Sequence, residues 1–276
     1  MSTFSRLKTI TRYCAPGLFA LALPLSASAH YLWLLPSQFE LGAQEQWITA
    51  DVAISKTLFR YDALPMPLEG LAITAPDAST VQPSEPQVRQ RRSVFDARLD
   101  QDGVYRVAVH DHALFALYKV QGQLKKWHGT EQAFKGLLPA DAQDVQVSET
   151  DTRLEAFVVR NHPGAMAPTP LGKGLEIIPQ AALDSFTRGG HSAFVVLLDG
   201  KPARDIPVTL VHNAQHADGE ANKVEMTTAA DGSFVAQWAD AGTYLLTAQA
   251  RDAHPQLKAA SGRRLAYGLT LSVRSD

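Results

Sequence analysis

Residues 231–250 read DGSFVAQWADAGTYLLTAQA and contain two apolar runs, each preceded by a turn dipeptide. Ser233 to Trp238 and Tyr244 to Ala250 combine β-branched, aromatic and apolar residues at strand length. Asp231-Gly232 and Ala241-Gly242 place glycine where tight turns need it. This stretch therefore predicts two β-strands joined by a short turn.

The same pattern extends outward through most of the chain. Short apolar or alternating runs recur between Gly- and Pro-containing turns, and this spacing is typical of β-sandwiches and barrels, not of βαβ units. Thr130 to Leu137 (TEQAFKGL) is the one helix candidate, with Thr130 as its cap and Gly136 close to its end. The further predicted strands are Trp47–Ile54, Val104–Val109, Leu114–Val120, Arg153–Val159, Leu175–Ile178, Ser192–Leu198, Val208–His212, Val224–Thr228 and Ala266–Val273.

A domain boundary is predicted near residues 162–172 (HPGAMAPTPLG), which are rich in Pro and Gly and show no periodicity. We expect an all-β protein of two β-sandwich domains. Residues 30–165 form the N-terminal β domain, and residues 172–276 form a second domain of the size of an Ig-like or transthyretin-like sandwich. Residues 75–92 are polar and contain three prolines, so we expect an exposed loop there.

The first 29 residues have the three parts of a cleavable export signal. Arg6, Lys8 and Arg12 precede a short apolar core, and Ala27-Ser-Ala29 is a small-x-small cleavage pattern. Cleavage would leave His30 as the first residue. It would also remove Cys14, the only cysteine, so no disulfide or thiolate site would remain.

The charge argues against nucleic acid as a partner, and the hydropathy argues against a membrane-spanning segment after the signal. Without the signal, 23 basic residues face 28 acidic ones, a net charge of −5 with His neutral. Such a surface offers no basic field for nucleic acid. No other apolar run reaches the length needed to span a membrane.

Several motifs, taken in order, resemble one protein family. HYLWLLP (30–36) follows the expected cleavage site, GLEIIP (174–179) opens the second domain, and the chain also contains GQLKKWHG (122–129), LLDGKP (197–202) and AGTYLL (241–246). This order resembles domain-of-unknown-function family 4198, a group often labelled a periplasmic component of nickel/cobalt uptake. The resemblance implies a periplasmic location, a β-sandwich architecture and the handling of divalent metal ions.

His30 is the first candidate metal ligand. An N-terminal histidine carries an α-amine and a ring nitrogen that can chelate one ion, and both are neutral at mildly alkaline pH. His110 and His112 lie two residues apart in VYRVAVHDH, so both rings point to the same face if the strand continues, with Asp111 on the other face. We therefore predict a metal site formed by His30, His110 and His112.

Further candidate ligands are His128, beside Trp127, and the pair His212 and His216, which we place on a hairpin loop. All nine histidines follow the signal and no cysteine does, so nitrogen and oxygen atoms are the only donors. Ni²⁺ or Co²⁺ is favoured by the family resemblance, and Cu²⁺ by intrinsic affinity for nitrogen donors.

No G-x-S-x-G, H-E-x-x-H, P-loop or G-x-G-x-x-G motif is present. We therefore predict a periplasmic, non-enzymatic binding protein for a divalent metal ion, supporting metal uptake or homeostasis. An envelope metal transporter or an outer-membrane receptor is the expected partner. One alternative is a β-sandwich assembly or adhesion module of the cell envelope that binds no metal. Another is a copper-dependent oxidase built on His30.

Overall fold

The computed structural model describes residues 30–213 and 222–275. Strands dominate these residues, which confirms the predicted all-β class. The described part contains one α-helix, α1 (Glu131–Phe134), and one 3-10 helix, η1 (Leu183–Ser185). Thr130 caps α1 as expected, because its Oγ1 accepts a hydrogen bond from the Ala133 amide at 3.2 Å. Within the described ranges, no helix is long and apolar enough to cross a membrane.

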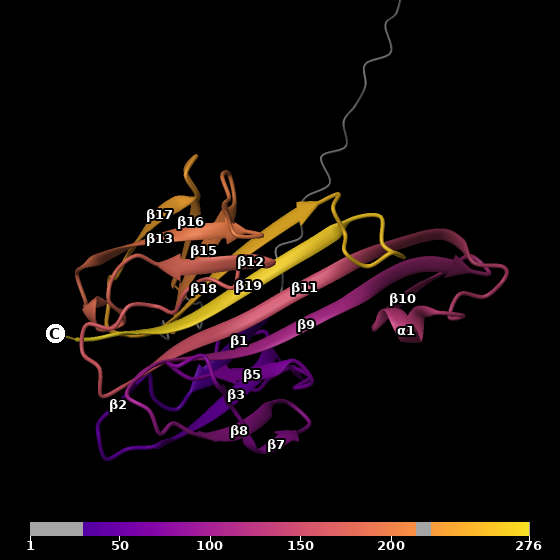
Figure 1. The fold of residues 1–276 in the computed structure, drawn as a ribbon. Helices are drawn as coiled ribbons and strands as arrows, with labels where there is room; N and C mark the ends of the chain where they lie inside the picture. The colour runs from indigo at the N-terminus through magenta and orange to yellow at the C-terminus, as the bar shows by residue number, and fades with distance from the viewer. Residues whose placement is uncertain (1–29, 214–221, 276) are drawn as a thin grey trace, which may run out of the picture.

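A central sheet of ten strands runs through the whole molecule (Figure 1). Its main order is β16-β15-β18-β19-β11-β9-β5-β6, with β10 added beside β9 and β2 beside β11. The strands are β2 (Glu40–Leu41), β5 (Leu71–Thr74), β6 (Thr80–Val81), β9 (Gly103–Val120), β10 (Gln123–Gly129), β11 (Gln143–Arg160), β15 (Pro207–His212), β16 (Asn222–Thr227), β18 (Gly242–Asp252) and β19 (Arg263–Val273).

Two smaller sheets cover opposite faces of the central sheet (Figure 1). The first small sheet, drawn in indigo and purple, has the order β1-β3-β8-β7, with β4 beside β3. The second small sheet has the order β12-β13-β14, with β17 beside β13. The strands are β1 (Tyr31–Pro36), β3 (Trp47–Ser55), β4 (Leu64–Pro65), β7 (Ser84–Val88), β8 (Ser93–Arg98), β12 (Leu175–Pro179), β13 (His191–Leu198), β14 (Lys201–Pro202) and β17 (Ser233–Gln237).

Alternation along β11 and β19 divides the apolar side chains between two cores. Leu154 packs under the first small sheet, and we call this side of the central sheet the Leu154 face. Phe157 and Tyr267 point the other way, into the core under the second small sheet. His112 lies on that second side, which we call the His112 face, because it stands opposite Asp151 in the β9–β11 register.

The two sandwiches share one sheet, because β11 and β19 pair in parallel over eight positions. No local sequence pattern predicts this pairing, because β11 and β19 are separated by nearly the whole second sandwich. The two predicted domains, 30–165 and 172–276, meet within the segment that joins β11 to β12, and these limits remain a prediction from sequence.

Two local expectations are corrected by the structure. Val104–Val109 and Leu114–Val120 belong to one continuous strand, β9, which together with β11 extends beyond the body of the molecule (Figure 1). Residues 75–92 are not a loop throughout, because β6 and β7 lie within them. Pro86 is tolerated in β7 because β7 is an edge strand with an irregular register to β8.

Candidate metal centre

His110 and His112 lie on the same face of β9, as expected for an unbroken strand. Their rings stack with centroids 5.9 Å apart and planes 4° from parallel. Strand β11 pairs with β9 in regular antiparallel register over this stretch, with His112 opposite Asp151 and Leu114 opposite Glu149. Asp151 and Glu149 therefore share the His112 face with the two imidazoles.

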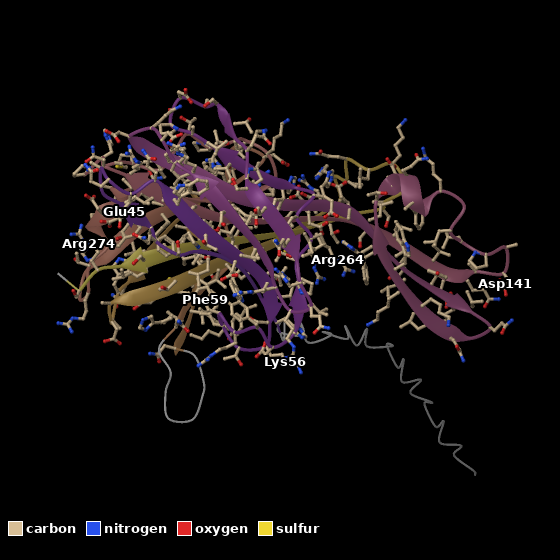
Figure 2. All side chains as sticks on the ribbon, turned by 90° about the horizontal axis from the view of Figure 1, so that it is seen from below. Glu45, Lys56, Phe59, Asp141, Arg264 and Arg274 are labelled. Carbon is tan, nitrogen blue, oxygen red and sulfur yellow. The ribbon has the colours of Figure 1, made fainter. Side chains whose placement is uncertain are left out.

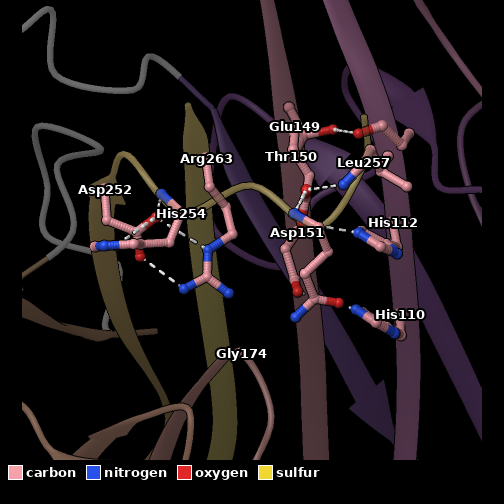
Figure 3. A network of polar contacts seen from close by, with 12 residues as sticks. His110, His112, Glu149, Thr150, Asp151, Gly174, Asp252, His254, Leu257 and Arg263 are labelled. Atoms are coloured by element: carbon pink, nitrogen blue, oxygen red, sulfur yellow. Dashed lines mark hydrogen bonds and ion pairs between the residues drawn. The ribbon is translucent and has the colours of Figure 1, made fainter. Parts of the chain in front are cut away.

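Each histidine contacts one carboxylate of β11. The Nε2 atom of His110 lies 2.9 Å from Asp151 Oδ1, and the Nε2 atom of His112 lies 2.9 Å from Glu149 Oε1. Figure 3 shows both rings projecting from their strand toward the strand that carries the two acids. The histidine side chains are about one-third exposed, whereas Glu149 is fully buried and Asp151 nearly so. The pairs therefore place partly exposed imidazole rings over buried carboxylates.

Glu149 is held from the other side by the segment that joins β18 to β19. Its Oε2 atom accepts a backbone hydrogen bond from the amide of Leu257 at 2.8 Å and another from the amide of Gln256. Two backbone donors and one imidazole thus fix a carboxylate that has no access to water. This arrangement presets the orientation of the oxygen that faces His112.

The pKa of Asp151 reflects competition between burial and positive charge. Burial raises this pKa, but the hydrogen bond with His110 and the charges of protonated His110, protonated His112 and Arg153 outweigh it. The pKa of Asp151 consequently lies below its ordinary value of 3.8. Asp151 is therefore an anion at neutral pH and is available as a donor to a cation.

Further charged residues follow Asp151 along the His112 face of β11. Arg153 and Glu155 follow Asp151 on the same face and are both buried. Glu155 accepts a hydrogen bond from the Tyr267 hydroxyl at 2.6 Å and lies 3.5 Å from the Arg106 guanidinium. Burial raises the pKa of Glu155 despite the opposing charges of Arg106 and Arg153. This face of β11 thus carries two acids, an arginine and a third acid in one buried row, and the first two acids contact the two histidines.

His112, Glu149 and Asp151 form a candidate metal site. One ligand atom from each lies within 4.8 Å of the others, and no further group of three or more such side chains occurs among residues 30–213 and 222–275. Ligands on opposite sides of an ion, each at about 2.1 Å, are about 4.2 Å apart. Three ligands cannot all be opposite one another, and neighbouring ligands of one ion are only about 3.0–3.6 Å apart, so the donors would draw together by up to about 0.7 Å each to hold one divalent ion. His110 does not belong to this group, but its contact with Asp151 is the kind that orients a ligating carboxylate.

The structure does not bring His30 into this cluster. His30 directly precedes β1, which lies on the Leu154 face: a Cβ atom added at Gly268 would lie 3.3 Å from the carbonyl oxygen of Leu32. The rings of His110 and His112 project from the opposite face of the same sheet. The predicted His30 site and the pair of histidines are therefore two separate places in the fold.

The other candidate histidines lie elsewhere. His128 is on β10, on the Leu154 face, where its Nε2 atom is 3.3 Å from Asp111 Oδ2. His212 was expected on a loop, but it ends β15 as a buried residue stacked on Tyr244 with ring centroids 4.1 Å apart. His216 and the export signal at residues 1–29 lie outside the described residues.

Glu149 and Asp151 were missed at the level of sequence, although both histidines of the cluster were found. The signal was present: Ser148 to Arg153 places acids two residues apart, the same spacing as the two histidines. This spacing becomes informative only when β9 and β11 are known to pair with His112 opposite Asp151. The local sequence does not specify which strands pair or in which register.

These features define a class of protein: an all-β chain in which two small sheets pack on opposite faces of one shared sheet, with His110, His112, Glu149 and Asp151 clustered on one of these faces. The chain belongs to the family described as "Domain of unknown function (DUF4198)", whose model matches residues 27–252. This match confirms the family resemblance that the motifs indicated. No curated protein matches the chain.

Solved structures show only distant likeness. The D0-D1 domain of intimin is 11% identical with a TM-score of 0.23, and the alignment covers 88% of this chain and 97% of that one. A DUF4785 family protein from Legionella pneumophila is 8% identical with a TM-score of 0.25, covering 81% of this chain and 53% of that one. The chicken CNTN1 FN1-FN3 domains are 6% identical with a TM-score of 0.23, covering 88% and 98%. At these scores the likenesses carry no argument about function.

Proposed function

We propose that this chain is an exported binding protein for a divalent transition-metal ion, which it holds through His112, Glu149 and Asp151. The observation that carries the proposal is the convergence of one imidazole nitrogen and two buried carboxylate oxygens within 4.8 Å of one another. Buried acids side by side repel each other unless a cation lies between them. In the structure each of the two acids instead contacts the ring nitrogen of one histidine.

The donor set favours borderline divalent metals. Imidazole suits Ni²⁺, Cu²⁺ and Zn²⁺, while carboxylates suit harder ions, so a mixed nitrogen–oxygen set fits Ni²⁺ or Co²⁺. The uptake role linked with the family resemblance also favours these two metals. Cu²⁺ binds such ligands more tightly by intrinsic affinity, so selectivity would depend on which metal is supplied. An envelope transporter or outer-membrane receptor would exchange the ion with the protein.

Binding at this site is coupled to protons. His112 must present a neutral nitrogen to the metal, and the ion displaces any proton shared with Glu149. Metal affinity is therefore expected to fall as the pH drops, because protons compete with the metal for the ring nitrogen. Acidification would release the ion without a large movement of the fold.

The test is calorimetric titration of the exported, signal-processed protein with Ni²⁺, Co²⁺, Cu²⁺ and Zn²⁺ at neutral pH. We expect one ion per chain and a loss of affinity of tenfold or more in His112→Ala and Asp151→Asn. His191→Ala, an exposed histidine on β13, is the matched control and should bind as the wild type does. Far-ultraviolet circular dichroism and melting temperatures establish that each variant is folded.

Two results would contradict the proposal. Binding that survives His112→Ala but is lost in His30→Ala, or on addition of one residue before His30, would place the ion at the amino terminus. No binding of any of the four ions would favour the alternative of an envelope assembly module without a metal. Oxygen consumption by the copper-loaded protein with a reductant would instead indicate an oxidase.

A further inference from the structure

A concave site lies on the Leu154 face, on the opposite side of the central sheet from His112, Glu149 and Asp151. Residues 113–148, which we call the arm, extend from the body of the molecule, and Figure 2 shows Asp141 toward the tip of the arm and Arg264 where the arm leaves the body. A cleft of about 330 Å³ lies at this junction. Its walls include Phe115, Leu117, Gln146, Ser148, Arg251 and Arg264.

Two arginines of this cleft face each other without compensation. Arg251 of β18 stands directly opposite Arg264 of β19 in antiparallel register. Like charges at directly opposed positions destabilise a sheet. Within the described residues neither arginine takes part in an ion pair, whereas the neighbouring Arg263 is bound by Asp199 and Asp252. The cleft therefore offers two exposed guanidinium groups with unused donors.

The arm contributes two apolar side chains to the cleft, beside the polar Gln146 and Ser148. Phe115 and Leu117 are partly exposed residues of β9 on the Leu154 face. The Arg264 guanidinium lies 5.5 Å from the centroid of the Phe115 ring. A pair of cations beside an aromatic wall recognises a ligand that is anionic at one end and apolar at the other.

We infer that this cleft binds a small organic carboxylate. The carboxylate lies between Arg251 and Arg264, and the apolar part of the ligand packs on Phe115 and Leu117. A planar carboxylate matches the forked donors of a guanidinium, and the anion removes the repulsion between the two arginines. A volume of about 330 Å³ is that of a small-molecule site. Because the cleft and the metal cluster lie on opposite faces of the sheet, this inference does not depend on the proposed metal binding.

Benzoate is the probe, with acetate and inorganic phosphate as comparisons, each titrated calorimetrically into the full-length protein at low salt with a chelator present. We expect one benzoate per chain, bound more tightly than acetate or phosphate. Arg251→Gln and Arg264→Gln should each weaken benzoate binding about tenfold or more, since each removes a charge-assisted hydrogen bond. Phe115→Ala should weaken benzoate but leave acetate unchanged.

Arg188→Gln removes an exposed arginine near the other end of β19 and should leave benzoate binding intact. Melting temperature gives a second readout. Without an anion, Arg251→Gln should melt above the wild type, because the repulsion is gone, and benzoate should then raise its melting temperature less than that of the wild type.

The inference is overturned if benzoate fails to bind at about 10 mM. It is also overturned if neither arginine substitution weakens binding, or if phosphate binds as tightly as benzoate and Phe115→Ala changes nothing.

Discussion

At the scale of single residues, the two stacked histidines have different expected roles. His112 has a ring nitrogen close enough to Glu149 and Asp151 for all three residues to bind one ion. His110 contacts only Asp151 of these two acids. We predict that His112→Ala abolishes metal binding, whereas His110→Ala weakens it by about 10- to 100-fold, as is usual for a residue that orients a ligand. Calorimetry with Ni²⁺ measures both. Equal losses in the two variants would make His110 a ligand as well.

The hydroxyl of Tyr267 supports the buried acid next to the cluster. It donates to Glu155 Oε2, while Glu155 Oε1 has no hydrogen-bond partner. We predict that Tyr267→Phe lowers the free energy of unfolding by about 1–3 kcal/mol, because the acid loses its one short hydrogen bond. Urea unfolding provides the measurement. Tyr118→Phe, on a partly exposed tyrosine of the arm, serves as the control and should change the free energy of unfolding little.

At the scale of elements, β1 packs closely on β19 at Gly268, which has no side chain. A Cβ atom at position 268 would lie 2.9 Å from Leu154 Cδ2 and 3.3 Å from the Leu32 carbonyl oxygen. We predict that Gly268→Ala destabilises the protein by about 1–3 kcal/mol through overpacking. Gly42→Ala meets only the tip of the Glu45 side chain, at 4.0 Å, and should stay within about 0.5 kcal/mol of the wild type. Equal stability of the two variants would show that β1 is not seated as described.

Arg263 links β19 to the turn after β13. Its guanidinium bonds Asp199 at 2.7 Å and Asp252 at 2.6 Å, and these hydrogen bonds lower the pKa of both acids below 3.8. An acid whose pKa is lower in the folded than in the unfolded protein stabilises the fold at any pH above its unfolded-state pKa. This stabilisation is lost as the pH falls through the lower, folded-state pKa.

Arg263→Gln should therefore destabilise the protein by about 2–3 kcal/mol at pH 7. The difference in the free energy of unfolding between Arg263→Gln and the wild type should become smaller as the pH falls below about 4. Urea unfolding at several pH values checks this, with Arg204→Gln, from an exposed pair with Asp205, as the control. A difference that stays constant with pH would mean that the two acids do not depend on Arg263.

At the scale of the whole molecule, local signals predicted the elements but not how they assemble. Turn dipeptides such as Asp231-Gly232 and the cap at Thr130 are short-range features, and the structure has a turn and a helix there. The parallel pairing of β11 with β19 joins strands about 100 residues apart, and no local pattern specifies it. The candidate metal site was predicted only in part for the same reason. The strand pattern alone indicated that His110 and His112 share a face, whereas Glu149 and Asp151 join them only because β11 pairs with β9.

The most direct measurement is the position of a bound ion. Crystals of the signal-processed protein grown with Ni²⁺ or Co²⁺, with anomalous data collected at the metal edge, locate the ion without reference to any variant. We predict one strong peak at about 2.0–2.2 Å from His112 Nε2 and from one carboxylate oxygen each of Glu149 and Asp151. A peak at His30 on the opposite face, or no ordered peak beside β9 and β11, would contradict this prediction.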